Sequence, residues 1–469
     1  MSSFHDRGRL CSAALALAAL VLPASAQAQT ALNLRALGGL APFGALPNTS
    51  AGMAALAANY SVTGAIQTGT AGQPALQPFG FQQQQALSDA FITSANGTQL
   101  ADGLGSKLGA VYRSLALYAS ADYGKTTTIT NVSPAVATLI GYTSALSGAD
   151  SNAAKYFFGN ATYVNGKTTS PLSKDALDIF TAAGVKADAY GIAYHVPAGS
   201  PGSDPNGDSR PFQTEKTFVG YAGTDYFGAP ALNVDYLAGP AQPLVASPAF
   251  PSGHTTYGYT ESLLLALLVP ERYTQMIARG AEYGNSRIVL GAHYAMDVIG
   301  GRTLAYYDLA QLLAGTPGYA GQTFGRFTVT DYAGAFAAAK ADLDKALESG
   351  CGKPVAVCAQ ADGSRFKDGP ADAAFYESTQ TYGLPVVFAS TASKVEDVGA
   401  LAPEAGHLLT AAFPKLTLAQ ADRILTETEG PGGGFLDNGR AFGLYSRLDL
   451  YKAGERAASL SAAVTPGHS

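Results

Sequence analysis

The sequence predicts an all-α protein: a helical bundle core with its functional site between helix N-termini, plus an irregular N-terminal arm and a C-terminal extension. Residues 108–123, 173–186 and 416–428 space their apolar side chains as helices do. Residues 261–269 form an apolar run between a Pro-Ser-Gly turn and Pro270. The chain therefore signals both the beginning and the end of a buried helix in this region.

The composition allows a large core and restricts the partners. Of the 469 residues, 47% are hydrophobic, which is ample for such a core. The 29 basic and 35 acidic residues give a net charge of −6, which argues against a nucleic acid or an anionic membrane surface as partner. Any site for an anion therefore has to be a local basic pocket in an acidic protein.

The first residues of the chain have the pattern of a secretory signal peptide. Arg7 and Arg9 precede an apolar run at residues 12–22, and small residues follow at positions 24–28. The apolar run is shorter than the roughly 20 residues that a membrane-spanning helix needs. We therefore expect a cleaved signal at residues 1–28 and export of the protein, either to a periplasm or out of the cell.

The rest of the chain divides into three parts. Residues 29–105 are rich in Ala, Gly, Gln and Asn with weak periodicity, which predicts a largely irregular arm with short helices. Residues 106–350 hold the helices that pack around the site, and residues 351–469 form a helical extension packed on that body. Beyond the signal, the longest apolar run is residues 263–269, which is far too short to cross a membrane.

Two cysteines, Cys351 and Cys358, remain once the signal is removed, and they flank a short stretch that contains Gly352 and Pro354. In the oxidising compartment that export implies, this spacing predicts a disulfide that closes a small loop. A metal site is the poorer interpretation, because the sequence has no second cysteine pair and no histidine nearby.

His293 and Asp297 are the first candidates for catalysis. They are four residues apart, so on a helix the carboxylate can accept Nδ1–H and leave Nε2 free as a base or nucleophile. Arg287 precedes His293 by six residues and would lie on another helical face, so the two converge only if a helix begins between them. Gly291 is the natural break. His293 would then lie in the first turn, where the helix dipole favours a bound anion.

A second group of candidates begins the helix at residues 254–269. Pro251, Ser252 and Gly253 form a turn that leads into this helix. Ser252 offers a hydroxyl and Gly253 an unshielded backbone N–H, and both suit phosphate oxygens. His254, on the rim, would be placed to protonate a leaving oxygen.

These residues carry a resemblance to a known family. Pro-Ser-Gly-His at residues 251–254, and the pattern SR-x5-H-x3-D at residues 286–297, resemble the second and third motifs of the type 2 phosphatidic acid phosphatase superfamily. That superfamily also contains soluble bacterial acid phosphatases and vanadium haloperoxidases. Its first motif is K-x6-RP, and Arg210 followed by Pro211 fits the end of it.

The first motif is incomplete. Ser203 stands at the position of the lysine, and the nearest lysines are Lys186 and Lys216, neither at the expected spacing. Either a lysine from elsewhere in the chain enters the pocket, or the two arginines Arg210 and Arg287 suffice.

The resemblance implies a phosphatase that hydrolyses phosphomonoesters without a metal ion or other cofactor. His293 would form a phosphohistidine, Asp297 would orient it, and His254 would protonate the leaving alcohol. The phosphoryl oxygens would be held by Arg210, Ser252, Gly253 and Arg287. The substrate class stays open among small phosphomonoesters, lipid phosphates, diphosphates and nucleotides, and so does the oligomeric state.

Two alternatives remain from the sequence. The first is a haloperoxidase that holds vanadate as cofactor in the same pocket. Only 32 residues separate His254 from Arg287, a spacing typical of the phosphatases, whereas haloperoxidases generally insert a longer segment. The second is a binding or structural protein with an inactive site, for which Ser203 in place of lysine is the sequence argument.

Overall fold

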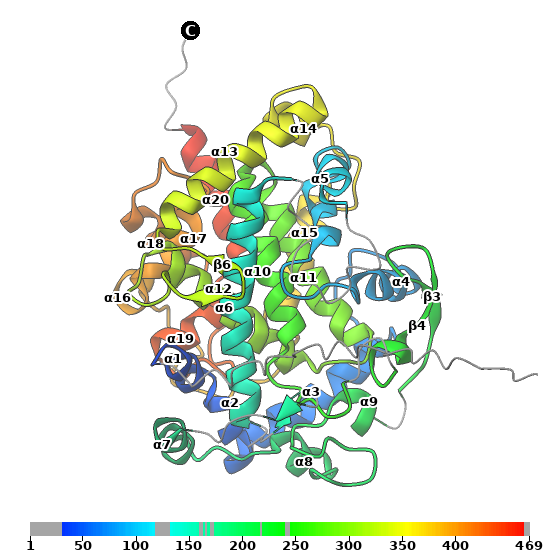
Figure 1. Ribbon diagram of the computed structural model, residues 1–469. Coiled ribbons are helices and arrows are strands. Elements are labelled where there is room, and N and C mark those ends of the chain that lie inside the picture. Colours follow the sequence, from blue (N-terminus) through cyan, green and yellow to red (C-terminus); the bar gives the residue numbers. More distant parts are fainter. Residues whose placement is uncertain are drawn as a thin grey trace, which may run out of the picture.

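The computed structural model describes residues 31–117, 132–158, 163–164, 167–168, 173–215, 218–239 and 244–463. The described chain is mainly helical (Figure 1), which confirms the predicted all-α class. Its strands form three two-stranded antiparallel hairpins: β1 (Tyr163–Val164) with β2 (Lys167–Thr168), β3 (Ala222–Thr224) with β4 (Pro230–Leu232), and β5 (Thr323–Phe324) with β6 (Phe327–Thr328). The predicted signal at residues 1–28 lies outside the described residues.

Helix α10 (Gly253–Leu268) forms the centre of the bundle. It contacts α6 (Pro134–Phe158), α11 (Tyr273–Val289) and α12 (Ala295–Leu313), which surround it in Figure 1. Because α10 is covered on several sides, the side chains of its apolar run are buried. Ser252 is its N-cap, with Oγ accepting the N–H of Thr255 at 3.1 Å, and Pro270 follows its end, as the sequence predicts.

The reversal between α11 and α12 depends on a glycine. Gly291 has φ +87°, and a Cβ at this position would overlap the ring of Phe218. The helix does break at Gly291, as predicted, but His293 does not lie in the first turn of α12. Tyr294 takes the extended N-cap conformation, so His293 is the residue just before the cap.

The N-terminal arm is more helical than the sequence indicates. Residues 54–58 of its longest helix are almost all alanine, the strongest helix former, yet alanine adds little apolar periodicity to the sequence. This helix, α3, packs against α11 and α12. The α-helices in this region are α1 (Ala31–Leu40), α2 (Pro42–Ala45), α3 (Ser50–Gln67) and α4 (Phe79–Asp89).

Three short helices lie between α6 and α10 in the chain. They are α7 (Lys174–Ala183), α8 (Ala189–Tyr194) and α9 (Pro211–Thr214). The predicted helix at residues 173–186 corresponds to α7. The helix predicted at residues 108–123 is α5 (Leu108–Ala116), which ends earlier than predicted because Leu117 takes the left-handed conformation as its C-cap.

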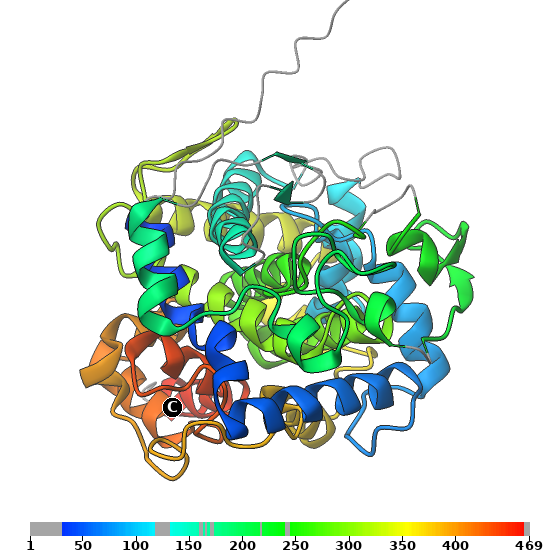
Figure 2. The same cartoon turned by 90° about the horizontal axis from the view of Figure 1, so that it is seen from below.

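The C-terminal part packs on the same bundle, and Figure 2 shows its orange and red helices gathered on one side of the molecule. Arg302 of α12 donates to the carbonyls of Thr379, Gln380 and Ser446 at 3.0–3.1 Å, which ties this part to the site helix. Its helices, which follow α13 (Tyr332–Cys351), are α14 (Val355–Gln360), α15 (Gly369–Thr381), α16 (Val398–Leu401), α17 (His407–Thr410), α18 (Leu418–Glu427), α19 (Ala441–Leu444) and α20 (Leu450–Ala463).

Cys351 and Cys358 are joined in a disulfide between the end of α13 and α14, as predicted. Among the described residues, no helix combines the length and the apolar composition that crossing a bilayer requires.

Candidate active site

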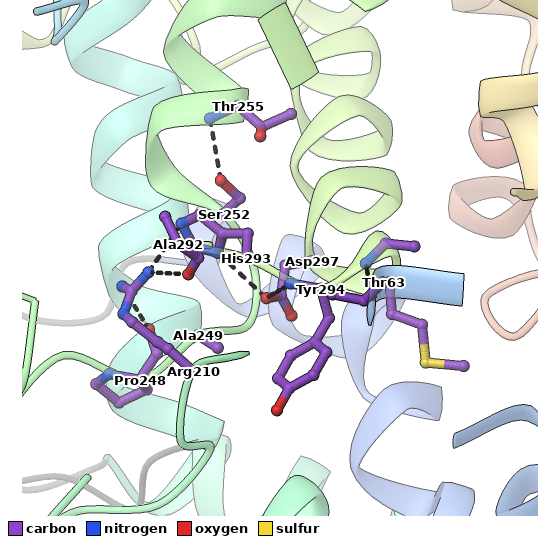
Figure 3. Close-up of polar contacts among 12 residues, drawn as sticks. Thr63, Arg210, Pro248, Ala249, Ser252, Thr255, Ala292, His293, Tyr294 and Asp297 are labelled. Carbon is purple, nitrogen blue, oxygen red and sulfur yellow. Dashed lines mark hydrogen bonds and ion pairs between the residues drawn. The ribbon is translucent and has the colours of Figure 1, made fainter. Parts of the chain in front are cut away.

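His293 and Asp297 form a fully buried hydrogen-bonded pair at the start of α12 (Figure 3). Nδ1 of His293 lies 3.1 Å from Oδ2 of Asp297. The same oxygen accepts the backbone N–H of Tyr294 at 2.8 Å, and Oδ1 accepts the hydroxyl of Tyr190 at 2.6 Å. Both carboxylate oxygens are therefore fixed, and with them the orientation of the imidazole.

Arg210 lies on the other side of the imidazole. Its Nη1 is 2.9 Å from Nε2 of His293 and 2.9 Å from the carbonyl oxygen of Ala292. A guanidinium can only donate, so Nε2 must be the acceptor and the proton of the neutral ring must be on Nδ1, facing Asp297. The remaining donors of Arg210 bind Ser247 and the carbonyl of Pro248. The arrangement thus presents a lone pair of His293 directly to a buried cation.

The first residues of α10 approach the same point. The backbone N–H of Ser252 donates to the carbonyl of Asp297 at 3.0 Å, which joins the beginnings of α10 and α12. Gly253 is the first residue of α10, and His254 follows it, half-buried beside the ring of Tyr257. The N-termini of α10 and α12 therefore lie next to each other at the site.

Arg287 reaches the site from the end of α11. Its carbonyl accepts the N–H groups of Ala292 and His293 at 3.1 and 3.3 Å, which holds the reversal after α11. Its side chain is buried, and after burial, which is the larger cause, its positive charge lowers the pKa of both His254 and Arg210. The predicted residues thus meet where α10, α11 and α12 converge.

The buried cations control the ionisation of the site. Burial, and then the charges of Arg210 and Lys155, lower the pKa of His293 well below its ordinary value. The pKa of His254 is also lowered, first by burial and then by Arg287. Burial raises the pKa of the Asp297 carboxyl to about 6, against the opposing effect of its hydrogen bonds. Because both pKa values lie well below 6.5, both imidazoles are neutral near pH 7, and His293 keeps the lone pair that a nucleophile needs.

The structure adds residues that the sequence reasoning missed. Asn59 and Thr63 on α3 accept the N–H groups of Met296 and Ala295 at 3.0 and 3.1 Å. These are first-turn donors of α12 that would otherwise lack a partner. Tyr190 on α8 anchors Asp297, as described above. No motif marks these three positions, because their contacts join helices far apart in the chain.

Ser203, at the lysine position of the first motif, packs within its own loop, and a different lysine lies beside the site. Ser203 is buried and donates to the carbonyl of Ser200 at 2.7 Å, so it holds its own loop. Of the two nearest lysines, Lys186 is exposed to solvent and Lys216 lies outside the described residues. Lys155 on α6 instead lies beside the site, with Nζ donating to the carbonyl of Pro248 at 2.6 Å. The sequence feature that could have indicated Lys155 is that it is the one basic residue of a long, mainly apolar helix.

The candidate site of this all-α protein is thus a buried histidine between a carboxylate and an arginine, beside the N-termini of two helices. Residues 205–313, which contain this histidine, carboxylate and arginine, match the PAP2 superfamily. No solved structure gives a significant match to the chain.

The curated relatives cover a short part of this chain. An acid phosphatase of Zymomonas mobilis is 44% identical over 64 residues, which are 14% of this chain and 24% of the relative. Non-specific acid phosphatases of Salmonella typhimurium and Providencia stuartii are 42% and 38% identical over 64 residues, again 14% of this chain and 26% of each relative. The chain therefore spans about a quarter of the length of the curated relatives it matches.

Proposed function

We propose that this protein is a phosphatase that hydrolyses phosphomonoesters through a phosphohistidine at His293. The observation that carries this proposal is the environment of one atom. Nε2 of His293 faces the guanidinium of Arg210, while Asp297 holds Nδ1–H on the opposite side of the ring. The match to the PAP2 superfamily, and relatives named acid phosphatases, support the same reaction.

In the first step, the lone pair on Nε2 of His293 attacks phosphorus. The P–N bond forms as the bond from phosphorus to the leaving oxygen breaks, and the ring becomes positively charged. Asp297 stabilises that charge through Nδ1–H. As the phosphoryl group takes the place at Nε2, the Nη1–H of Arg210 turns from the nitrogen to a phosphoryl oxygen. Arg287 and the N–H of Gly253 hold the other oxygens.

His254 supplies the proton that the leaving alkoxide takes up, so the first product departs as an alcohol. In the second step His254 accepts a proton from water, whose oxygen attacks phosphorus and breaks the P–N bond. The products are an alcohol and phosphate, and both histidines return to their starting state. The negative charge of a bound phosphate ester offsets the cations that lower the pKa of His254, and so favours the protonated acid.

No metal ion takes part in this proposal. Arg210, Arg287 and the two helix N-termini supply the positive potential that two-metal phosphatases obtain from their ions. The substrate is a small-molecule or lipid phosphate ester. The site of action is outside the cytoplasm, which rests on the signal pattern at residues 1–28.

Vanadate tests this proposal against the haloperoxidase alternative. Vanadate adopts the trigonal-bipyramidal geometry of the phosphoryl transition state, so it should bind much more tightly than phosphate. We expect competitive inhibition of nitrophenyl phosphate hydrolysis, and no more than trace bromination of a reporter dye with peroxide and bromide. Strong bromination by the vanadate-loaded protein, with negligible hydrolysis in its absence, would overturn the proposal. Absence of any vanadate binding would favour an inactive site.

A further inference from the structure

Lys155 is a buried cation that the proposed reaction has not used. It lies near the end of α6 and is 4% exposed. Its ammonium donates to the carbonyls of Pro248 and Ala249, at 2.6 and 3.4 Å. An ammonium has three N–H donors, and neither of these acceptors carries a charge.

The surroundings of Lys155 are those of the phosphoryl site. The carbonyl of Pro248 also accepts Nη2 of Arg210 at 3.1 Å, so the ammonium and the guanidinium meet at one oxygen. On its other side, Cε of Lys155 lies 3.7 Å from the point where a Cβ on Gly253 would be. Lys155 therefore lies between Arg210 and the first residue of α10.

A buried ammonium in this position is costly unless an anion compensates for it. Burial in a protein interior strongly disfavours the charged form of an unpaired amine. In the described part of the chain, Lys155 forms no ion pair with a carboxylate. The ammonium of Lys155 and the guanidinium of Arg210 also repel each other, because both bind the carbonyl of Pro248. A phosphoryl group between them would offset both the cost of burying the ammonium and this repulsion.

We propose that Lys155 is the lysine of the phosphoryl site, supplied by α6 in place of the position that Ser203 occupies. It donates an N–H to a phosphoryl oxygen, beside Arg210 and the N–H of Gly253. The long side chain brings the ammonium to the site from a different helix, while the loop before Arg210 is left to pack on itself. This inference rests on the proposed function, because it assigns one further ligand to the same bound group.

Charges around Lys155 make phosphate binding depend on pH. Burial, and then Arg210, lower the pKa of Lys155 well below its ordinary value. A bound anion favours the ammonium, so affinity for phosphate should fall as the pH rises past this lowered pKa. The other groups that face Lys155 are Asp204, Asp208 and Asp297, which favour the ammonium, and His254 and His293, which are neutral when the site is empty.

The test compares Lys155→Met with Lys340→Met. Lys340 is a matched control, because its ammonium also donates to a backbone carbonyl at α10, but at Leu268 on the far end of the helix. A charge-assisted hydrogen bond contributes enough that Lys155→Met should raise the inhibition constant of inorganic phosphate by about 10- to 100-fold. Lys340→Met should leave it unchanged. Unchanged phosphate inhibition in a folded Lys155→Met protein would overturn the inference.

A pH profile provides a second readout that a purely structural role would not change. In wild type, the phosphate inhibition constant should rise with pH in the alkaline range below about pH 10, where phosphate stays a dianion, both histidines stay neutral and Arg210, whose pKa burial lowers to about 10, keeps its charge. In Lys155→Met this rise should be absent. If Lys155→Met does not fold, the pH profile of the wild-type protein decides. A phosphate inhibition constant that does not change with pH over that range would overturn the inference. A wild-type protein that neither hydrolyses nor binds phosphate would overturn the proposed function itself.

Discussion

Thr63→Val tests whether the N-terminal arm positions the nucleophile. Oγ1 of Thr63 accepts the N–H of Ala295 at 3.1 Å, and Thr63 is buried. Valine keeps the shape of the side chain but removes the acceptor. The N–H of Ala295 is then buried without a partner, which costs about 1–3 kcal/mol. Ala295 lies two residues after His293, so any shift of α12 that recovers a partner also moves the nucleophile.

We expect this substitution to lower both stability and turnover. Urea unfolding should show a loss of about 1–3 kcal/mol. The kcat for nitrophenyl phosphate should fall about 10-fold, which corresponds to about 1.4 kcal/mol of transition-state stabilisation.

Thr49→Val is the matched control for Thr63→Val. Thr49 is the N-cap of the same helix, and its Oγ1 accepts the N–H of Gly52 at 3.0 Å, away from the site. Loss of this cap should cost about 1 kcal/mol of stability with no change in kcat. If both variants lose stability and neither loses turnover, the arm supports the fold and does not position His293.

Three further predictions address the acid, the anchor of the carboxylate and a buried acid in α10. His254→Ala should lower kcat by roughly 10²–10⁴-fold for alkyl phosphates and far less for nitrophenyl phosphate, whose phenolate leaves without a proton; equal losses would mean that His254 only positions the substrate. Tyr190→Phe removes the donor to Oδ1 of Asp297 and should lower kcat about 10-fold at constant KM, and a change in KM alone would contradict that role. Burial raises the pKa of the Glu261 carboxyl from 4.5 to about 7, so the stability linked to this group is fully present below pH 4.5 and is lost as the pH rises through about 7. The loss amounts to about 3 kcal/mol. The difference in unfolding free energy between wild type and Glu261→Gln should therefore change by that amount between pH 4.5 and about 7. A difference that stays constant over this range would refute the raised pKa of Glu261.

Local spacing was enough to predict that the side chains of His293 and Asp297 meet. The four-residue separation of His293 and Asp297 allows the imidazole and the carboxylate to meet. Gly291 marks the break between two helices that lets Arg287 approach this pair. The cap at Ser252 follows from the turn that precedes an apolar run. Each of these inferences uses residues within one helix or one turn. The spacing could not show that His293 precedes α12, because helix boundaries depend on which residue takes the N-cap conformation.

Local spacing could not predict the residues that reach the site only through tertiary packing. Lys155 comes from α6, and Thr63 from an arm that looks irregular because alanine carries no apolar pattern. Tyr190 lies on a helix of six residues, too short for its periodicity to be recognised. In each case the side chain meets the site only after helices distant in the sequence have packed together.

The most direct test of the account is to trap the phosphoenzyme. Wild-type protein mixed with a phosphate ester and quenched rapidly should yield an acid-labile, base-stable phosphate adduct that peptide mass spectrometry places on His293. Asp297→Asn should form the same adduct much more slowly, and His293→Ala should form none. A covalent adduct that persists in folded His293→Ala, or turnover by wild type without any adduct at His293, would contradict the proposed mechanism.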